Sequence, residues 1–261
     1  MIAGLAAAWR IGFAHVFAAR AEAAVQLLSV SVIAGLNGAL WTAAVDGRDS
    51  VGGVGGRAVV GSVVLAWVSV SFVASRVNED VAARIREGSI VADLLRPVPP
   101  QLWWYARDLG RACGAFLLQT APLFLISTVL FDPPLSANPA RWLAWLVALL
   151  LAHATNFGLT FAIGLAAVAT HHTTGLAHLK STLVSIFSGA LVPLALYGPG
   201  ARALADALPF RAMAHLPATI LLGDAEPLRA LAVQAAWAVA LWAGAAVAWA
   251  AARRRLAIDG G

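Results

Sequence analysis

Six long apolar stretches constrain most strongly what this chain can fold into. A helix needs about 20 mainly apolar residues to cross the hydrocarbon core of a bilayer. The stretches lie at residues 24–45, 58–77, 109–131, 141–168, 183–199 and 229–251. The composition agrees, because only 12% of the residues are charged, whereas soluble domains average about 25%. The sequence therefore predicts an all-α polytopic integral membrane protein with six transmembrane helices.

The distribution of basic residues predicts how these helices are oriented. Loops rich in Lys and Arg stay on the cytoplasmic side of a membrane. If the N-terminus is cytoplasmic, twelve of the eighteen basic residues fall on that side. We therefore expect a multi-pass membrane protein with both termini in the cytoplasm. The net charge of +5 does not indicate a nucleic-acid partner, because the bases are spread singly between apolar runs.

Residues 2–20, ahead of the first predicted span, have the spacing of an amphipathic helix. Large apolar side chains recur there every three or four residues: Ile2, Leu5, Trp9, Phe13 and Phe17. Such a helix can lie in the interface of the membrane as an anchor. It can equally dock a cytosolic partner, and the two roles are compatible.

The acidic residues argue against ion-coupled transport and against catalysis within the membrane. An ion-coupled carrier normally binds its ion at a carboxylate or histidine inside the bilayer. All thirteen Asp and Glu lie outside the six predicted spans, and His153 is the one candidate base inside them. We expect neutral polar residues of the spans, such as Asn156 and Gln234, to hydrogen-bond between helices. The chain also lacks a phosphate-binding Gly-x-x-x-x-Gly-Lys-Ser/Thr loop, so we expect no enzymatic activity and no cofactor in this chain.

Charged residues concentrate between the second and third predicted spans. Residues 78–108 read NEDVAARIREGSIVADLLRPVPPQLWWYARD and carry nine charges. Asp80 and Arg84 have the i, i+4 spacing of an ion pair on one helix. Gly88 is expected to break the helix, and Pro97 to end a second one. The segment is either a solvated loop on the head groups or a lever that transmits a partner's movement to the neighbouring spans.

Two smaller clusters have simpler interpretations. The Trp-Trp-Tyr sequence at 103–105 stands where the third span begins, as expected of an aromatic belt at the membrane interface. His171, His172 and His178 belong to a polar loop that could bind a metal. No carboxylate or thiol accompanies them, so we predict no metal site.

Residues 200–227 are too apolar for a free loop, yet Pro209, Pro217 and Pro227 prevent one continuous helix. Backbone that bends at membrane depth must be covered by protein. The segment therefore forms either an outer lid that dips back into the bilayer or a packed surface loop.

The chain as a whole resembles the ABC-2 type permeases, the transmembrane subunits of bacterial ABC exporters whose ATPase is a separate chain. The resemblance rests on the span pattern, on REGSIVADLLRP at 86–97, on LPFRAMAHLPATILLGD at 208–224 and on a basic tail that ends in GG. REGSIVADLLRP is the most specific of these features, because apolar segments match many polytopic proteins by composition alone.

The resemblance implies one transmembrane permease domain over 1–261. Within it, 2–20 would be an interfacial helix, 78–108 the cytoplasmic coupling segment and 200–227 an outer re-entrant segment. Eleven residues would lie in the region that couples to the ATPase: Glu79, Asp80, Arg84, Arg86, Glu87, Gly88, Asp93, Leu94, Leu95, Arg96 and Pro97.

The resemblance also implies partners. The chain would pair with a second permease, identical or related, and with a cytosolic ABC ATPase that holds ATP and Mg²⁺. It would sit among membrane lipids, in the bacterial inner membrane, without nucleic acid, and would export an amphipathic or hydrophobic substrate. The alternative from another class is a non-transporting membrane scaffold or assembly protein.

Overall fold

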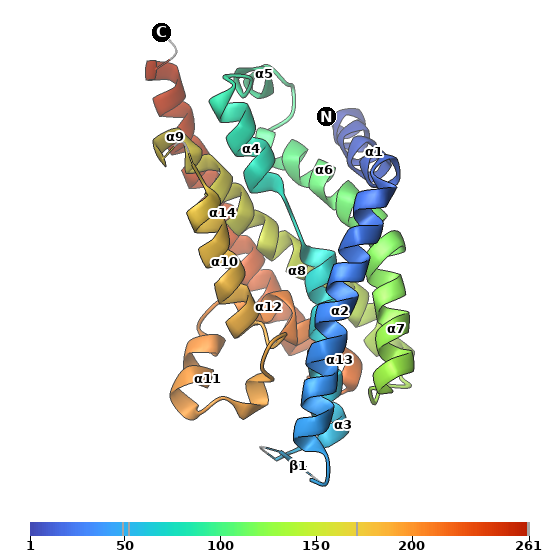
Figure 1. Ribbon diagram of the computed structural model, residues 1–261. Helices are drawn as coiled ribbons and strands as arrows, with labels where there is room; N and C mark the ends of the chain where they lie inside the picture. Colours follow the sequence, from blue (N-terminus) through green and yellow to red (C-terminus); the bar gives the residue numbers. More distant parts are fainter. Residues whose placement is uncertain (49, 52, 171, 260–261) are drawn as a thin grey trace.

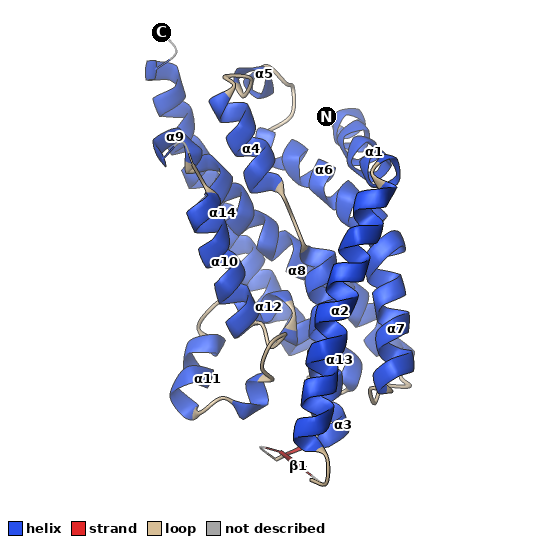
Figure 2. Cartoon of the chain, in the orientation of Figure 1, coloured by secondary structure: helices blue, strands red, loops and turns tan. Residues whose placement is uncertain are grey.

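A computed structural model describes residues 1–48, 50–51, 53–170 and 172–259, and these residues are almost entirely helical (Figures 1 and 2). The elements are α1 (Ile2–Ala18), α2 (Arg20–Val45), β1 (Ser50–Val51), β2 (Val54–Gly55), α3 (Gly56–Val73), α4 (Val77–Arg86), α5 (Val91–Leu94), α6 (Pro100–Ala115), the π-helix η1 (Phe116–Thr120), α7 (Ala121–Phe131), α8 (Pro139–Leu165), α9 (Ala167–Thr170), α10 (Thr174–Phe187), the 3-10 helix η2 (Leu194–Leu196), α11 (Pro199–Asp206), α12 (Phe210–Met213), α13 (His215–Leu222) and α14 (Pro227–Asp259). The all-α prediction is confirmed.

Five helical stretches of the described residues are long and apolar enough to cross a membrane: Arg20–Val45, Gly56–Arg86, Pro100–Phe131, Pro139–Thr170 and Pro227–Arg255. They correspond to five of the six predicted spans.

The predicted span at 183–199 is not a single helix. Helix α10 ends at Phe187, and Gly189 then turns the chain with a φ of +79°. The 14 residues of α10 extend about 21 Å at 1.5 Å per residue, which is less than the roughly 30 Å of a hydrocarbon core.

The long helices run between two ends of the molecule (Figure 1). The start of α1, the end of α14 and helices α4 and α5 lie at one end, which we call the termini end. The antiparallel pair of β1 and β2 and helix α11 lie at the opposite end, which we call the hairpin end. The start of α1 and the end of α14 therefore lie at the same end of the molecule.

Helix α8 lies at the centre and contacts α3, α4, α6, α12, α13 and α14. Toward the termini end its Phe157 and Phe161 are buried with Val81 of α4 and Trp104 of α6. Gly158 lets α14 come close, because a Cβ there would lie 2.9 Å from the carbonyl carbon of Leu241. The packing of α4 and α6 against α8 is therefore part of the core.

Neutral polar residues hydrogen-bond between the helices, as predicted. Nδ2 of Asn156 donates to the carbonyl oxygen of Val73 at 2.6 Å. Nε2 of Gln234 donates to the carbonyl oxygens of Ala148 and Ala212, at 3.0 and 2.7 Å. Each of these bonds joins two different elements.

Helix α1 packs against α6 by a face that the apolar spacing did not predict. Its buried residues are Ala8, Gly12 and Val16, whereas Ile2 is 81% exposed. A Cβ on Gly12 would overlap the backbone of α6, and one on Gly110 would overlap the backbone of α1. Gly110 also begins a Gly-x-x-x-Gly sequence, the pattern that lets helices approach closely.

The segment 200–227 contains three short helices. Helix α13 is buried from Leu216 to Leu222 and contacts α3 and α8. Nη1 of Arg141 holds the end of α13 by donating to the carbonyl oxygens of Ile220 and Ala225. Helix α13 is therefore not part of a surface loop, whereas α11 is largely exposed.

Candidate functional site

The predicted coupling segment, 78–108, forms most of α4, all of α5 and the first half of α6, and α4 and α5 lie at the termini end. Helix α4 ends at Arg86, Gly88 follows with a φ of +70°, and α5 begins at Val91. A residue with φ in this region favours glycine. The predicted break at Gly88 is confirmed, and Pro97 lies beyond the end of α5 as expected.

Asp93 is the centre of a first cluster of charges. Its carboxylate is 1% exposed and lies 3.1 Å from Nη1 of Arg84 and 3.2 Å from Nη2 of Arg96. The indole N–H of Trp104 donates to the same carboxylate at 3.3 Å. The guanidinium of Arg96 also lies 3.7 Å from the centre of the Trp103 ring. Helices α4, α5 and α6 are thus joined around one buried anion.

A second cluster continues from α4 to the centre of the molecule. Asp80 of α4 accepts from Arg107 of α6 at 3.4 Å and also contacts Arg111. Nε of Arg111 lies 3.8 Å from Asp108, and Asp108 lies 3.6 Å from Nε2 of His153 in α8. Charged and polar side chains within 4 Å of one another therefore lead from α4 to the central helix α8, and the contacts of Asp108 with Arg111 and His153 are longer than hydrogen bonds.

These clusters correct two predictions. Asp80 and Arg84 do not pair with each other across one turn of α4, because each binds a residue of another element. Trp104 does not belong to an exposed aromatic belt, because it is buried against Asp93 and Phe157. In both cases a tertiary contact replaces the local one.

The position of Asp108 corrects a third prediction. Residues from Pro100 to Phe131 form one helical stretch that is a candidate span, and it includes Asp108, which is 2% exposed. The predicted span began at residue 109, one position too late to include it. Because an acid does lie within a candidate span, the distribution of acids does not exclude ion coupling.

The eleven predicted coupling residues divide into two groups. One group points inward into the two clusters, and its members are Asp80, Arg84, Asp93 and Arg96. The other group is exposed and consists of Glu79, Arg86, Glu87, Gly88, Leu95 and Pro97, which we call the exposed coupling residues. Leu95 is 83% exposed despite being apolar. The backbone of Leu94 lies in α5, and its side chain lies outside the described residues.

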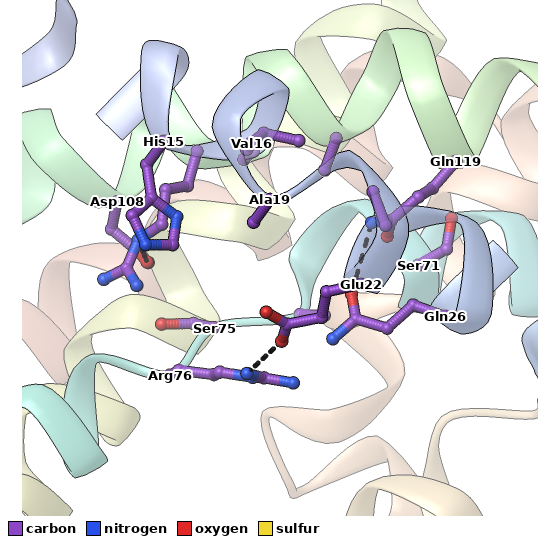
Figure 3. Close-up of a pocket in the computed structure, with 15 residues that line it drawn as sticks. His15, Val16, Ala19, Glu22, Gln26, Ser71, Ser75, Arg76, Asp108 and Gln119 are labelled. Carbon is purple, nitrogen blue, oxygen red and sulfur yellow. Dashed lines mark hydrogen bonds and ion pairs between the residues drawn. The ribbon is translucent and has the colours of Figure 1, made fainter. Parts of the chain in front are cut away.

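A pocket of about 180 Å³ lies next to the second cluster (Figure 3). Glu22 at the start of α2 forms an ion pair with Arg76, which precedes α4. Nε2 of Gln119 donates to Oε1 of Gln26 at 3.2 Å. Asp108 also lines this pocket. The ion pair ties the junction of α1 and α2 to the base of α4.

A larger cavity of about 740 Å³ opens at the hairpin end. Arg202, Arg211 and Arg229 line it from α11, α12 and α14. Burial, followed by the charges of Arg202 and Arg229, lowers the pKa of Arg211. Burial, followed by Arg211 and Arg202, lowers the pKa of His215 to about 4, so this ring is neutral at pH 7. Sequence reasoning missed this cavity, although LPFRAMAHLPATILLGD contains Arg211 and His215.

A family model described as ABC-2 family transporter protein matches residues 55–260. The chain belongs to this family. The match begins just before α3, so it includes both charge clusters and most of the cavity lining, and it confirms the resemblance to ABC-2 type permeases. No curated protein and no solved structure matches this ABC-2 family protein.

The histidine loop of the ABC-2 family protein is only partly described, because His171 lies outside the described residues. Within the described part of the chain, no three His, Cys, Asp or Glu side chains gather in a way that could hold a metal ion.

Proposed function

We propose that this ABC-2 family protein is the permease subunit of an ATP-driven exporter in the bacterial inner membrane. The ATPase is a separate cytosolic subunit that binds ATP and Mg²⁺, and this chain is neither an enzyme nor a cofactor carrier. The observation that carries the proposal is the charge path from α4 to α8, because it links an exposed charged segment to the membrane helices.

The first cluster, around Asp93, favours a lever over a solvated loop. A loop that lies loosely on head groups needs no buried carboxylate, whereas Asp93 is buried between two arginines. Removing one partner from such a pair is strongly unfavourable, so α4 and α5 move together with α6. A displacement of the exposed coupling residues by the ATPase would therefore reach α6 and α8 through packed elements.

The proposed topology places the termini end in the cytoplasm. All of 1–261 forms one permease domain, with α1 at the membrane interface. Helix α10 and η2 together form a short fifth crossing, and the chain between 200 and 227 re-enters the membrane from the outside. The burial of α13 between α3 and α8 supports this arrangement, because bent backbone at membrane depth needs protein around it.

A second permease and lipid cover the remaining apolar surface. Large apolar side chains are exposed along α2, α7, α8 and α14, among them Leu36, Val129, Leu143 and Val239. Exposed apolar surface on this scale is typical of lipid-facing or partner-facing helices. The substrate would pass between two permeases and is amphipathic or hydrophobic.

The test of the lever uses the exposed coupling residues Arg86 and Glu87. Arg86→Ala and Glu87→Ala should abolish export and weaken co-purification of the ATPase at least tenfold. The folded yield should stay unchanged, because neither side chain has an ion-pair partner among the described residues. Arg48→Ala and Asp46→Ala, at exposed positions of the hairpin end, are the matched controls.

The same purification separates the exporter from the scaffold. Mass spectrometry of the wild-type complex should find a cytosolic ATPase in stoichiometric amount, and its ATP hydrolysis should be measurable in the complex. A chain that repeatedly purifies without any nucleotide-binding partner, in several mild detergents, would favour the scaffold. Wild-type export by both variants would contradict the lever.

A further inference from the structure

The cavity at the hairpin end has the size and position of a ligand site. Its volume of about 740 Å³ lies within the 300–1,000 Å³ that is typical of small-molecule sites. Its lining comes from β2, α3, η2 and α11 to α14. It lies at the opposite end from the coupling segment, so it is separate from the proposed contact with the ATPase.

Three arginines from three helices converge on this cavity. Arg202 and Arg229 form no ion pair with any described residue, and Arg211 contacts Asp206. Nε of Arg211 is nevertheless buried and has no hydrogen-bond partner among the described residues. A buried donor without a partner is unfavourable, and an acceptor atom bound beside Arg211 would stabilise it.

The two carboxylates that line the cavity do not balance the three arginines. Glu226 is engaged by the first turn of α14, since its carboxylate accepts from the backbone N–H groups of Leu228 and Arg229, at 3.0 and 2.6 Å. Glu226 keeps its negative charge in these bonds, and Asp224 is the other lining carboxylate. His215 does not add a positive charge at pH 7. The three lining arginines outnumber the two lining carboxylates, and Asp206 offsets the charge of Arg211, so Arg202 and Arg229 are the lining cations without an ion pair to a described residue.

One wall of the same cavity is apolar. Val59 of α3, Leu216 of α13 and Val233 of α14 line it beside the arginines. A small inorganic anion would leave this wall in contact with water. A molecule with both a charged and an apolar part would use both surfaces.

We propose that this cavity binds an anionic amphiphile. Its negatively charged head group lies among Arg202, Arg211 and Arg229, because guanidinium groups bind phosphate and carboxylate oxygens through charge-assisted hydrogen bonds. Its first carbon atoms lie against the wall formed by Val59 and Leu216. The inference rests on the proposed export function, in which this amphiphile is the class of substrate that occupies the outer end of the path.

The test measures binding to the purified full chain in neutral detergent. The probes are short-chain phosphatidylglycerol, phosphatidylcholine with the same acyl chains, and inorganic phosphate, each titrated by calorimetry. Phosphatidylglycerol should bind at least tenfold more tightly than either other probe, since phosphatidylcholine has no net charge and phosphate has no apolar part. The double variant Arg202→Gln/Arg229→Gln should lower the affinity for phosphatidylglycerol at least tenfold.

The matched control is Arg48→Gln. Arg48 is an exposed arginine of the hairpin end that does not line the cavity and donates to the carbonyl oxygen of Ala44 in the preceding helix α2. This variant should bind phosphatidylglycerol as the wild type does, which excludes a general loss of surface charge as the cause.

Three results would overturn the inference: equal affinity for phosphatidylglycerol and phosphatidylcholine, phosphate binding as tight as that of the lipid, or an unchanged affinity in the double variant. These results leave the ATPase measurement untouched. If the ATPase associates and the double variant binds lipid normally, the site is wrong and the exporter stands. If no ATPase associates but the double variant loses lipid binding, the site stands and the exporter is wrong.

Discussion

Arginines have different surroundings at the two ends of the molecule. At the termini end Arg84 and Arg96 share the buried carboxylate of Asp93. At the hairpin end Arg202 and Arg229 line a cavity without an ion pair to any described residue. The same residue type is structural at one end and available to a ligand at the other, and the carboxylate beside it makes the difference.

The physical reason lies in what each end encloses. A buried carboxylate needs cations and hydrogen-bond donors around it, so Asp93 holds its arginines in fixed positions. An exposed arginine keeps its charge in water at little cost, so Arg202 and Arg229 need no protein partner. The termini end should therefore lose stability when a charge is removed, whereas the hairpin end should lose binding.

The largest expected effect is a loss of unfolding free energy when the carboxylate of Asp93 is removed from the termini end. Asp93→Ala leaves Arg84, Arg96 and the indole N–H of Trp104 without their shared acceptor. Removing one partner of a buried ion pair costs about 3–5 kcal/mol, and the partial exposure of both arginines places the expected loss near the lower limit, at about 3 kcal/mol. Denaturant unfolding of the detergent-solubilised protein measures it. Asp46→Ala should change stability by less than about 0.5 kcal/mol, and an equal effect of both variants would contradict the contrast.

The second effect tests the close packing of α1 against α6, the helix that carries arginines of the second charge cluster. Gly110→Leu places a side chain where the backbone of Trp9 in α1 already lies. Overpacking of this kind costs about 1–3 kcal/mol, and α1 should become more accessible to protease. Gly35→Leu is the control, since nothing lies within 4 Å of a Cβ at Gly35. Equal protease resistance in wild type and Gly110→Leu would show that α1 does not depend on this contact.

Local sequence patterns predicted part of this architecture and missed the contacts that depend on the fold. Apolar length located five spans, and the glycine at 88 located the break between α4 and α5. The stretch 183–199 was equally apolar, but its length alone did not reveal the turn at Gly189. The Gly-x-x-x-Gly sequence from Gly110 is a general pattern of close helix contacts, and it does not by itself identify α1 as the partner.

The candidate site shows the same limit. The charged stretch after the second span was recognisable from its composition. Its Gly88 and Pro97 indicated where the two short helices of this stretch end. Asp80 forms ion pairs with Arg107 and Arg111 of α6 and not with Arg84, which is four residues away on its own helix. The reason is that α6 places those two arginines against α4. The three arginines of the hairpin-end cavity come from separate helices, so only their arrangement in space brings them together.

A smaller effect concerns the pH dependence of the hairpin end. Burial, Arg211 and Arg202 lower the pKa of His215 to about 4, below the value of about 6.5 for an exposed histidine. Between pH 6.5 and 4 the unfolded chain therefore binds more protons at this site than the folded chain, so stability falls as the pH is lowered. His215→Gln should make the unfolding free energy less pH-dependent than in the wild type, by about 1 kcal/mol between pH 7 and 5.5. Identical pH profiles would mean that His215 titrates as an exposed histidine.

The smallest effect on stability is expected for the arginines of the hairpin-end cavity, and it tests the difference between the two ends most directly. Arg202→Gln/Arg229→Gln should leave the unfolding free energy within about 0.5 kcal/mol of the wild type, because exposed side chains without an ion pair contribute little to folding. Denaturant unfolding in the absence of lipid measures this. The result matters beside Asp93→Ala, since the two variants remove charges at opposite ends of one chain. A loss as large as that of Asp93→Ala would mean that the hairpin-end arginines hold α11 and α14 together, and that the cavity is part of the scaffold of the fold.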